Sequence, residues 1–422
     1  MNKHDGKYYL QYGAPGTEFS GYGDGVYVGD HPLGPFTYQA HNPFSYKPGG
    51  FARGAGHGAT FQDKFGGWRH VSTMVIGVKN NFERRLGVFP AGFDGDGVLF
   101  ANTAYSDYPL YLPSAGNVDG LKGVSPGWMI LNYNKPVMVS STFGGYGANY
   151  AVDENIKTYW SAATGEAGEW FQTDLGEASD VYAIQVNYGD QDAGRGGAKD
   201  DVRGTRYDEG LRTRYEVRGT TRYEGRGTKD ETSISKYQVR SPKSGVGEKM
   251  AVMAMGKEAG LYTQYMIRSS LDGVHWTVMV DKSKSIKDAP HDYIDLGRAV
   301  KARYLKIENI HVPTGKFALS GFRAFGLAGK AKPEVVKNFV VLRGDKDNER
   351  RSAWLKWMQS DDAVGYTIYM GVSPEKLYNS VQLYGVNEYY FTGMDKTLPY
   401  YFQIEAYNEA GIGTRTGVVK VE

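Results

Sequence analysis

Residues 54–63 read GAGHGATFQD and place a single histidine, His57, between two glycines. Glycine tolerates backbone conformations that other residues avoid, so the chain here either turns sharply or approaches another segment closely. Residues 68–76, WRHVSTMVI, are rich in residues that favour β-strands. We therefore predict that His57 lies at the entrance to a pair of strands and points into open space. A turn with a solvated histidine is the simpler interpretation of the same pattern.

The composition of the chain favours an all-β protein of two to four domains. The 422 residues include 57 glycines and 33 tyrosines, and such a content fits short strands joined by tight turns. Tyrosine and tryptophan also stack on sugar rings, because each combines an apolar face with a polar tip. Composition does not separate these two explanations. The prediction of two to four domains comes from the length of the chain.

Charge and cysteine content exclude several classes of protein. The formal net charge is only +2, which gives no case for a nucleic-acid partner or for binding to a membrane surface. The absence of cysteine excludes disulfides and thiolate metal sites. No apolar run reaches the length of a membrane span. Residues 1–7 are followed by no apolar segment, so we expect no signal peptide in this chain.

Three motifs in residues 1–113 resemble glycoside hydrolase family 43, in the order that the family has them. Residues 7–13, KYYLQYG, resemble the strand after the family's Glu-Gly-Pro acid motif. The GHG at His57 resembles its later Gly-His-Gly strand entry, and residues 94–99, DGDGVL, resemble its closing Asp-x-Asp-Gly turn. The resemblance implies part of a five-bladed β-propeller. At roughly 40–50 residues per blade, residues 1–113 would supply the C-terminal two blades or slightly more.

The same resemblance implies glycoside hydrolysis with inversion. That reaction needs an acid and a base carboxyl group about 6.5–9.5 Å apart, with room for a water between them. Family spacing places these carboxyl groups upstream of Met1, so we expect no catalytic residue in this chain. Asp5 lies in an Asp-Gly turn, and Glu18 lies in the following loop. Neither matches a catalytic motif of the family.

Three residues are the candidates for contact with a substrate. His57 matches the histidine that faces the propeller channel, where the intact family holds an ion through water molecules. Arg84 falls at the spacing of an arginine that contacts the sugar, and its neighbour Arg85 stays an open alternative. An arginine there can hydrogen-bond sugar hydroxyl groups. A solvated charge at the end of a strand is the alternative for both arginines.

A second resemblance begins in the middle of the chain. Residues 147–160, GANYAVDENIKTYW, and 169–176, EWFQTDLG, are similar to the opening of a discoidin domain, also called a coagulation factor 5/8 C-type domain. This group includes carbohydrate-binding module family 32. Residues 270–276 and 302–307 fit its later strands. The resemblance implies a jelly-roll β-sandwich over residues 137–327, which takes ligands in loops at one end.

Asp153, Asn155 and Thr158 match the loop in which that family binds a structural calcium through oxygen atoms. The family often completes the site with a glutamate in an Ala-x-Ser-Glu pattern, where this chain has Gly321. One carboxylate is missing, so we expect calcium, the one cofactor implied, to bind weakly or not at all. The alternative is that Asp153 and Thr158 only cap a turn.

The remaining segments have other assignments. Residues 114–136 are predicted to be a linker. Residues at about 190–260 repeat Arg, Gly and Tyr, a composition that can bind single-stranded nucleic acid, but interleaved acidic residues favour an extended surface insertion. Residues 333–422 resemble a fibronectin type III β-sandwich. Tyr400 would be its corner tyrosine, with the hydroxyl turned back to the upstream backbone.

Together these resemblances predict the C-terminal part of a family 43 glycoside hydrolase of the β-xylosidase or α-L-arabinofuranosidase type. Its partner would be a plant cell-wall oligo- or polysaccharide such as xylan or arabinan, and the parent protein would be extracellular or periplasmic. The chain as it stands would have little or no activity. The main alternative is a non-catalytic carbohydrate-binding protein, and a surface adhesion protein is a third hypothesis.

Overall fold

The computed structural model describes residues 1–422 except 17–18, 79–83, 112–123, 190–261, 314 and 345–348. Its regular structure is almost entirely β-strand, which confirms the predicted all-β class. Within the described ranges the helices are two short 3₁₀ turns, η1 (Ala148–Ala151) and η2 (Glu349–Arg351). No helix in that part of the chain has the length and apolar character needed to cross a membrane. The insertion predicted at about 190–260 lies outside the described residues.

The first nine strands form what we call the N-terminal sheet. Strands β1 to β4 pair in sequence order as one antiparallel meander, and β6 to β9 form a second. One parallel bridge, between Gly23 and Ala55, joins the two meanders. Propeller blades are four-stranded meanders of this kind, and the five-bladed propeller stays a prediction. The strands are β1 (Asn2–His4), β2 (Lys7–Ala14), β3 (Gly23–Gly29), β4 (Phe36–Tyr38), β5 (Ser45–Tyr46), β6 (Arg53–Gln62), β7 (Trp68–Val75), β8 (Arg84–Phe93) and β9 (Leu99–Ala101).

The next eight strands form the central sandwich. Buried and half-buried residues alternate along the first part of β13 and along β14, so one face of each strand packs into the core around Trp160 and Phe171. The order of the main path is β10-β17-β13-β16-β14-β15. The strands are β10 (Met129–Ile130), β11 (Val137–Val139), β12 (Trp160–Ser161), β13 (Trp170–Tyr188), β14 (Gln264–Ser270), β15 (Thr277–Asp281), β16 (His291–His311) and β17 (Ala318–Leu327).

Strand β10 lies inside residues 114–136, which the sequence predicts to be a linker. Met129 and Ile130 pair with Gly326 and Phe325 of β17. Both side chains are buried, because they fill apolar space beside Phe325. The last part of the predicted linker is therefore a strand of the central sandwich.

The last eight strands form the C-terminal sandwich, with a three-stranded sheet, β18-β19-β22, and a five-stranded sheet built around β20 and β23. The hydroxyl group of Tyr400 accepts a hydrogen bond from the backbone N–H of Asp395 at 2.8 Å, so it turns back to the upstream backbone as expected. The fibronectin type III assignment stays a prediction. The strands are β18 (Val340–Arg343), β19 (Ser352–Lys356), β20 (Gly365–Gly371), β21 (Asn379–Tyr384), β22 (Glu388–Thr392), β23 (Tyr400–Asn408), β24 (Gly411–Ile412) and β25 (Val419–Val421).

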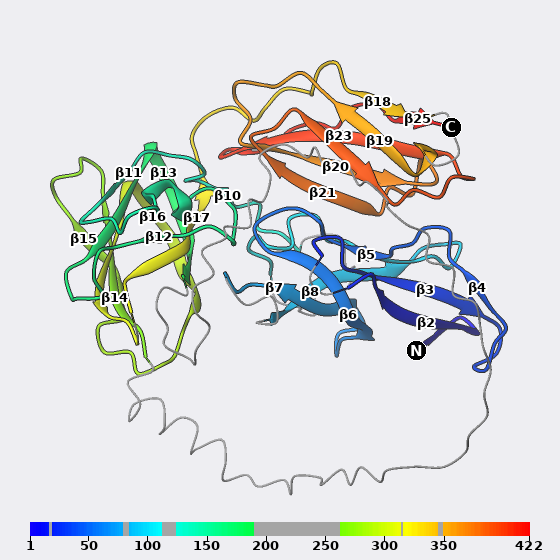
Figure 1. Cartoon of the computed structure of the whole chain (residues 1–422), viewed down its shortest axis with the longest axis horizontal. Helices are drawn as coiled ribbons and strands as arrows, with labels where there is room; N and C mark the ends of the chain where they lie inside the picture. The colour runs from blue at the N-terminus through cyan, green and yellow to red at the C-terminus, as the bar shows by residue number, and fades with distance from the viewer. Residues whose placement is uncertain (17–18, 79–83, 112–123, 190–261, 314, 345–348) are drawn as a thin grey trace, which may run out of the picture.

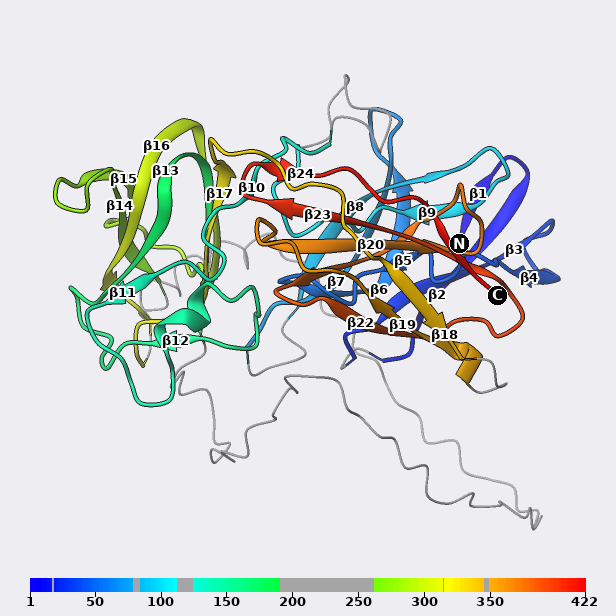
Figure 2. The same cartoon turned by 90° about the horizontal axis from the view of Figure 1, so that it is seen from above.

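The C-terminal sandwich lies over the N-terminal sheet, and the central sandwich lies beside both (Figures 1 and 2). The three parts meet at a buried charged cluster. Arg323 of β17 donates to both carboxylate oxygens of Glu154, at 2.8 and 2.7 Å, and to the backbone oxygen of Asp107 at 2.7 Å. Tyr384 of β21 donates to Glu154 at 3.0 Å, and Lys47 pairs with Asp107 at 3.0 Å. The cluster therefore ties the central sandwich to each of the other two parts.

The charges of this cluster stabilise one another in a buried setting. Burial alone would lower the pKa of Arg323, but Glu154 and Asp107 raise it above its usual value. Burial alone would raise the pKa of Asp107, but Lys47 and Arg323 hold it below its usual value. Arg323 and Asp107 therefore stay charged, and removal of a partner would leave a buried charge with less compensation.

Candidate functional site

His57 lies in a β-bulge of β6. Gly56 pairs with Thr73 and Ala59 pairs with Val71, so two residues of β6 lie opposite one residue of β7. His57 adopts a φ of 57°, in the left-handed region, and is exposed. The sequence places His57 at the entrance to a strand, whereas the structure places it in the middle of β6. The reason is that the irregular backbone indicated by the glycines is confined to the bulge. The strand continues on both sides of it.

The glycines on either side of His57 are required by close packing. A Cβ atom on Gly56 would lie 2.7 Å from the ring of Tyr22. A Cβ atom on Gly58 would lie 2.4 Å from both Asp24 Oδ2 and His70 Nε2. Real Cβ atoms do not approach other heavy atoms so closely. The two glycines of the Gly-His-Gly motif are therefore needed for two close contacts behind the bulge as well as for the bulge itself.

Behind the bulge lies a buried chain of hydrogen bonds. Asp24 Oδ2 lies 2.9 Å from His70 Nε2, and His70 Nδ1 lies 2.9 Å from Thr60 Oγ1. Thr60 donates to Gln11 Oε1 at 3.0 Å, and Gln11 donates to Asn2 Oδ1 at 2.6 Å. Asp24 is 1% exposed, so it supports the bulge and is closed to a substrate.

Arg84 and Arg85 open β8 and point in different directions. The guanidinium carbon of Arg84 lies 6.0 Å from the ring centre of Tyr22. Burial raises the pKa of the Tyr22 phenol and Asp24 adds to this effect, while Arg84 opposes it. Arg85 is exposed and donates to the backbone oxygen of Arg84 at 3.0 Å. Of the two predicted arginines, Arg84 is thus the one directed toward the ring that packs beside His57.

This surface of the N-terminal sheet offers an imidazole and a guanidinium group, while the Tyr22 ring between them is only 6% exposed. Each of these groups can hydrogen-bond a sugar hydroxyl group. Acid–base catalysis would also need a carboxyl group that reaches the substrate, and Asp24 is buried against His70. The roles of His57, Arg84 and Arg85 in substrate binding stay predictions.

Asp153, Asn155 and Thr158 come together in one turn of the central sandwich. Thr158 Oγ1 donates to Asp153 Oδ2 at 2.6 Å, and the backbone N–H of Asn155 donates to Asp153 Oδ1 at 3.0 Å. Burial raises the pKa of Asp153 to about 6, although these hydrogen bonds oppose the effect. Lys157, in the same turn, donates to the backbone oxygen of Gly77 at 2.6 Å. The turn therefore faces the N-terminal part of the chain.

The oxygens of this turn fit calcium poorly. Calcium takes six to eight oxygen ligands, with carboxylates prominent among them. Both carboxylate oxygens of Asp153 already accept hydrogen bonds from the turn. The neighbouring Glu154 is paired with Arg323, and Gly321 has no side chain to donate. Within the described ranges, no group of three or more His, Cys, Asp and Glu residues could hold a metal ion. Weak calcium binding stays a prediction.

An exposed aromatic ring lies in the loops at one end of the central sandwich. Phe143 is 39% exposed, and Lys316 Nζ lies 4.3 Å from the centre of its ring. Tyr146 stacks on Phe143 with ring centres 5.8 Å apart. The loops that carry Gly165 and Gly315 touch there, because a Cβ atom on Gly165 would meet the Gly315 oxygen at 2.3 Å. We call this region the Phe143 end.

Polar groups surround a carboxylate near the same loops. Glu169 accepts hydrogen bonds from Ser141, at 2.7 Å to Oε2, and from Thr164, at 2.7 Å to Oε1, and Ser140 also donates to it. Burial alone would raise the pKa of Glu169, but these hydroxyl groups hold it below its usual value. The Phe143 end thus combines an apolar ring, a cation and a fixed polar network. An amphipathic ligand could contact all three.

Sequence reasoning did not find Asp24, His70 or Phe143. The two glycines beside His57 were the available signal for Asp24 and His70, because each glycine marks a close approach. Phe143 is followed by glycines at residues 144–145, which mark a loop but do not say that the ring before them is exposed. The partners across each loop come from distant parts of the chain.

Comparison with known proteins identifies one segment. The model of the F5/8 type C domain matches residues 136–200, which include β11 to β13 of the central sandwich. This match agrees with the discoidin resemblance of residues 147–160 and 169–176. No curated protein sequence matches the chain.

Several solved structures are similar to parts of the chain. Chitosan-binding module 1 from the chitosanase/glucanase of Paenibacillus sp. IK-5 is 18% identical, covers 47% of this chain and 99% of its own, and has a TM-score of 0.28. The family 32 CBM from C. perfringens NanJ, in complex with galactose, is 14% identical over 47% of this chain and 98% of its own, with a TM-score of 0.28. A structure described as a glycoside hydrolase is 16% identical, with a TM-score of 0.34. It covers 76% of this chain, and this chain covers 58% of it.

Proposed function

We propose that this chain is a carbohydrate-binding protein and that its central sandwich holds the saccharide at the Phe143 end. The observation that carries the proposal is the F5/8 type C match at residues 136–200 over a sandwich whose loops expose Phe143 below Lys316. A sugar ring has an apolar face that can rest on an aromatic ring, while its hydroxyl groups reach charged and polar neighbours.

The chemistry of the Phe143 end suits a neutral or weakly polar sugar. Lys316 places an ammonium group, which is a hydrogen-bond donor, above the ring. Glu169 is held by Ser141 and Thr164, so the loops on which a sugar would rest are already fixed before it binds. A fixed site loses less conformational entropy on binding, which favours affinity. Binding, rather than a change in covalent structure, is what this arrangement supports.

We further propose that the chain derives from a family 43 glycoside hydrolase that acts on plant cell-wall polysaccharide. The three motifs of residues 1–113 support this proposal, as do the two four-stranded meanders and the strained His57 in the bulge between Tyr22 and Asp24. His57 and Arg84 would contact the sugar in the intact propeller. On this proposal the protein is extracellular or periplasmic, and its hydrolytic activity is low or absent, because the Asp24 carboxyl group behind the bulge is buried against His70.

Affinity electrophoresis in gels that contain xylan, arabinan or galactan tests the carbohydrate proposal. We expect the full chain to be retarded in at least one of these gels. Phe143→Ala should weaken the retardation by roughly fivefold or more, because loss of an aromatic contact worth about 1 kcal/mol changes affinity by that factor. Tyr293, also exposed and on β16, provides the control variant Tyr293→Ala.

The two variants distinguish binding at a specific site from non-specific binding through exposed aromatic rings. Equal loss of retardation in Phe143→Ala and Tyr293→Ala would contradict a site at the Phe143 end. Unchanged migration of the full chain in all three gels would contradict the carbohydrate proposal for these polysaccharides. Release of 4-nitrophenol from an aryl xyloside or arabinofuranoside, with a pH profile that shows two carboxyl groups, would contradict the proposed lack of hydrolysis.

A further inference from the structure

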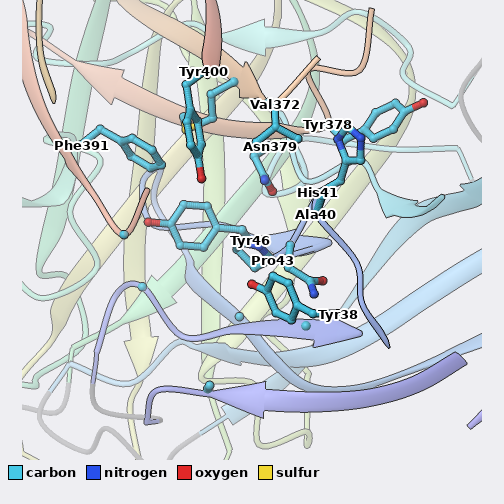
Figure 3. Close-up of a pocket in the computed structure, with 18 of the residues that line it drawn as sticks. Tyr38, Ala40, His41, Pro43, Tyr46, Val372, Tyr378, Asn379, Phe391 and Tyr400 are labelled. Carbon is cyan, nitrogen blue, oxygen red and sulfur yellow. The ribbon is translucent and has the colours of Figure 1, made fainter. Parts of the chain in front are cut away.

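A cavity of about 380 Å³ lies between the N-terminal sheet and the C-terminal sandwich. We call it the junction pocket. Tyr400 and Phe391 of the C-terminal sandwich face Tyr46 and Tyr38 of the N-terminal sheet across it, as Figure 3 shows. Its volume falls in the range of about 300–1,000 Å³ that is typical of small-molecule sites. The junction pocket is separate from the Phe143 end, which belongs to the central sandwich.

The aromatic walls of the junction pocket carry neutral hydroxyl groups. Burial raises the pKa of Tyr12 to about 12, and it also raises the pKa values of Tyr38, Tyr46 and Tyr400. These phenols therefore stay protonated at neutral pH and can donate or accept hydrogen bonds. Tyr12 and Tyr38 are substantially exposed, so the pocket opens to solvent on the side of the N-terminal sheet.

Two polar atoms of the wall are buried without a hydrogen-bond partner among the described residues. They are Asn379 Oδ1 in β21 and His41 Nδ1 in the loop after β4. A buried polar atom left unpaired costs roughly 1–3 kcal/mol. Burial lowers the pKa of His41, and Lys376 adds to the effect, so the imidazole is neutral at neutral pH. A ligand with hydroxyl groups would satisfy both atoms.

Lys376, the charged residue in the wall, already has ion-pair partners. Lys376 pairs with Asp94 at 2.8 Å and also with Asp96, and Tyr378 donates to Asp94 at 2.7 Å. The ring of Phe100 stacks on Tyr378 at 4.4 Å, which fixes this side of the pocket. A wall of rings with neutral polar atoms favours an uncharged ligand over a phosphate or a carboxylate.

We propose that the junction pocket binds one unit of a neutral saccharide. The apolar face of the sugar lies against the rings of Tyr46 and Tyr400, and its hydroxyl groups hydrogen-bond Asn379 and His41. The choice of a saccharide rests on the proposed function, whereas the existence of a ligand site rests on the cavity and its two unpaired atoms. Because the walls come from both parts, a bound sugar stabilises the junction between them.

Calorimetric titration of the full chain with xylotriose, arabinotriose and galactose tests this proposal. The Phe143→Ala variant weakens the site on the central sandwich by roughly fivefold or more, so a further loss of binding caused by a substitution in the junction pocket reports that pocket. Adding Asn379→Leu to that variant should weaken the remaining binding by about tenfold, the equivalent of one lost hydrogen bond to a buried acceptor. Asn387, exposed in the same sandwich, provides the control Asn387→Leu, which should leave binding unchanged.

A second variant keeps the test valid if Asn379→Leu fails to fold. Tyr38 is 48% exposed, so Tyr38→Ala should keep the thermal midpoint of the parent and still weaken the remaining binding several-fold. Equal affinities of Phe143→Ala with and without Asn379→Leu would overturn the junction pocket, as would binding of indole in place of the three sugars. Loss of all binding in Phe143→Ala alone would overturn it and leave the proposed function intact. Binding that survives Phe143→Ala unchanged but disappears in Asn379→Leu would support the junction pocket and overturn the role of Phe143.

Discussion

Glu154 combines a left-handed backbone with a buried charge. Its φ is 55°, a region that costs free energy for residues other than glycine. Arg323 holds its carboxylate through two hydrogen bonds, and Tyr384 donates a third. The strained conformation persists because it delivers this carboxylate to the place where the three parts of the chain meet.

Replacement of Glu154 by glutamine should destabilise the protein strongly. Arg323 would lose its two-oxygen partner and keep only the carboxylate of Asp107, at 3.8 Å, and breaking a buried pair in this way costs about 3–5 kcal/mol. Urea unfolding measures the change. Glu308→Gln is the matched control, because Glu308 pairs with Arg268 at the surface, where an ion pair contributes at most about 1 kcal/mol. A Glu154→Gln protein as stable as Glu308→Gln would contradict the account of the cluster.

Gly58 tests the packing behind the bulge. In Gly58→Ala the new Cβ atom would lie 2.4 Å from Asp24 Oδ2, His70 Nε2 and the backbone oxygen of Val71. Such overpacking costs roughly 1–3 kcal/mol or more, so we expect a clearly lower thermal midpoint. Gly95→Ala is the control, since a Cβ atom there meets nothing within 4 Å. Similar midpoints for the two variants would show that the buried chain is not packed as described.

The turn between β8 and β9 docks on the C-terminal sandwich. Asp94 accepts hydrogen bonds from the backbone N–H groups of Asp96 and Val98, at 2.9 Å each, and thereby closes the turn. Its other oxygen accepts from Tyr378 and pairs with Lys376. The Asp-Gly-Asp-Gly motif of residues 94–97 thus serves both the turn and an interface.

Acid should weaken this interface. Burial alone would raise the pKa of Asp94, but Lys376, Val98 and Tyr378 lower it to about 2. The folded protein then binds fewer protons at Asp94 than the unfolded chain does, so its stabilising effect is complete above the ordinary carboxyl pKa, near 3.8, and is lost as the pH falls toward 2.

Denaturant unfolding at pH 5 and at pH 2.5 measures this dependence. Asp94→Asn should be less stable than the parent at pH 5 and closer to it at pH 2.5. A constant difference between the two proteins across this range would argue against a charged Asp94 at the interface. Asp30→Asn, which affects an exposed pair with Lys7, is the control and should change little at either pH.

The sequence predicts local features of this fold better than distant ones. The glycines around His57, the turn of residues 94–97 and the corner hydroxyl of Tyr400 are visible because each depends on neighbours in the chain. The pairing of Asp94 with Tyr378 joins residues 284 positions apart, and no local pattern encodes it. The junction pocket was not predicted for the same reason, since its walls come from segments that meet only after folding.

The same limit applies to β10 and to the Phe143 end. Met129 and Ile130 look like linker residues in the sequence, because a two-residue strand shows no periodicity. Phe143 reads as an ordinary apolar residue, and its exposure follows from how the neighbouring loops pack. Burial is a property of the whole fold, so sequence pattern reports it only where a long strand alternates, as β13 does.

The three parts of the molecule share apolar contacts as well as charges. Tyr105 and Tyr108 pack with Phe325 of the central sandwich and Tyr407 of the C-terminal sandwich in one cluster. Tyr105 also donates to Glu405 at 3.0 Å. The segment after β9 is therefore buried between the two sandwiches and acts as a joint between all three parts.

Differential scanning calorimetry should show one main unfolding transition for the full chain. Parts that share a core and a buried charge cluster unfold together, whereas loosely linked domains melt separately. Glu154→Gln should split or broaden the transition, because it removes the carboxylate that joins Arg323 of the central sandwich to Tyr384 of the C-terminal sandwich. Three well-separated transitions in the parent protein would contradict the shared joint.

The most direct measurement for the central claim is a crystal structure of the full chain grown with the sugar that retards it most in affinity gels. We expect a sugar ring over Phe143, with Lys316 within hydrogen-bonding distance of its hydroxyl groups. A sugar bound elsewhere on the central sandwich, or bare Phe143 loops at a sugar concentration that saturates binding in solution, would contradict it.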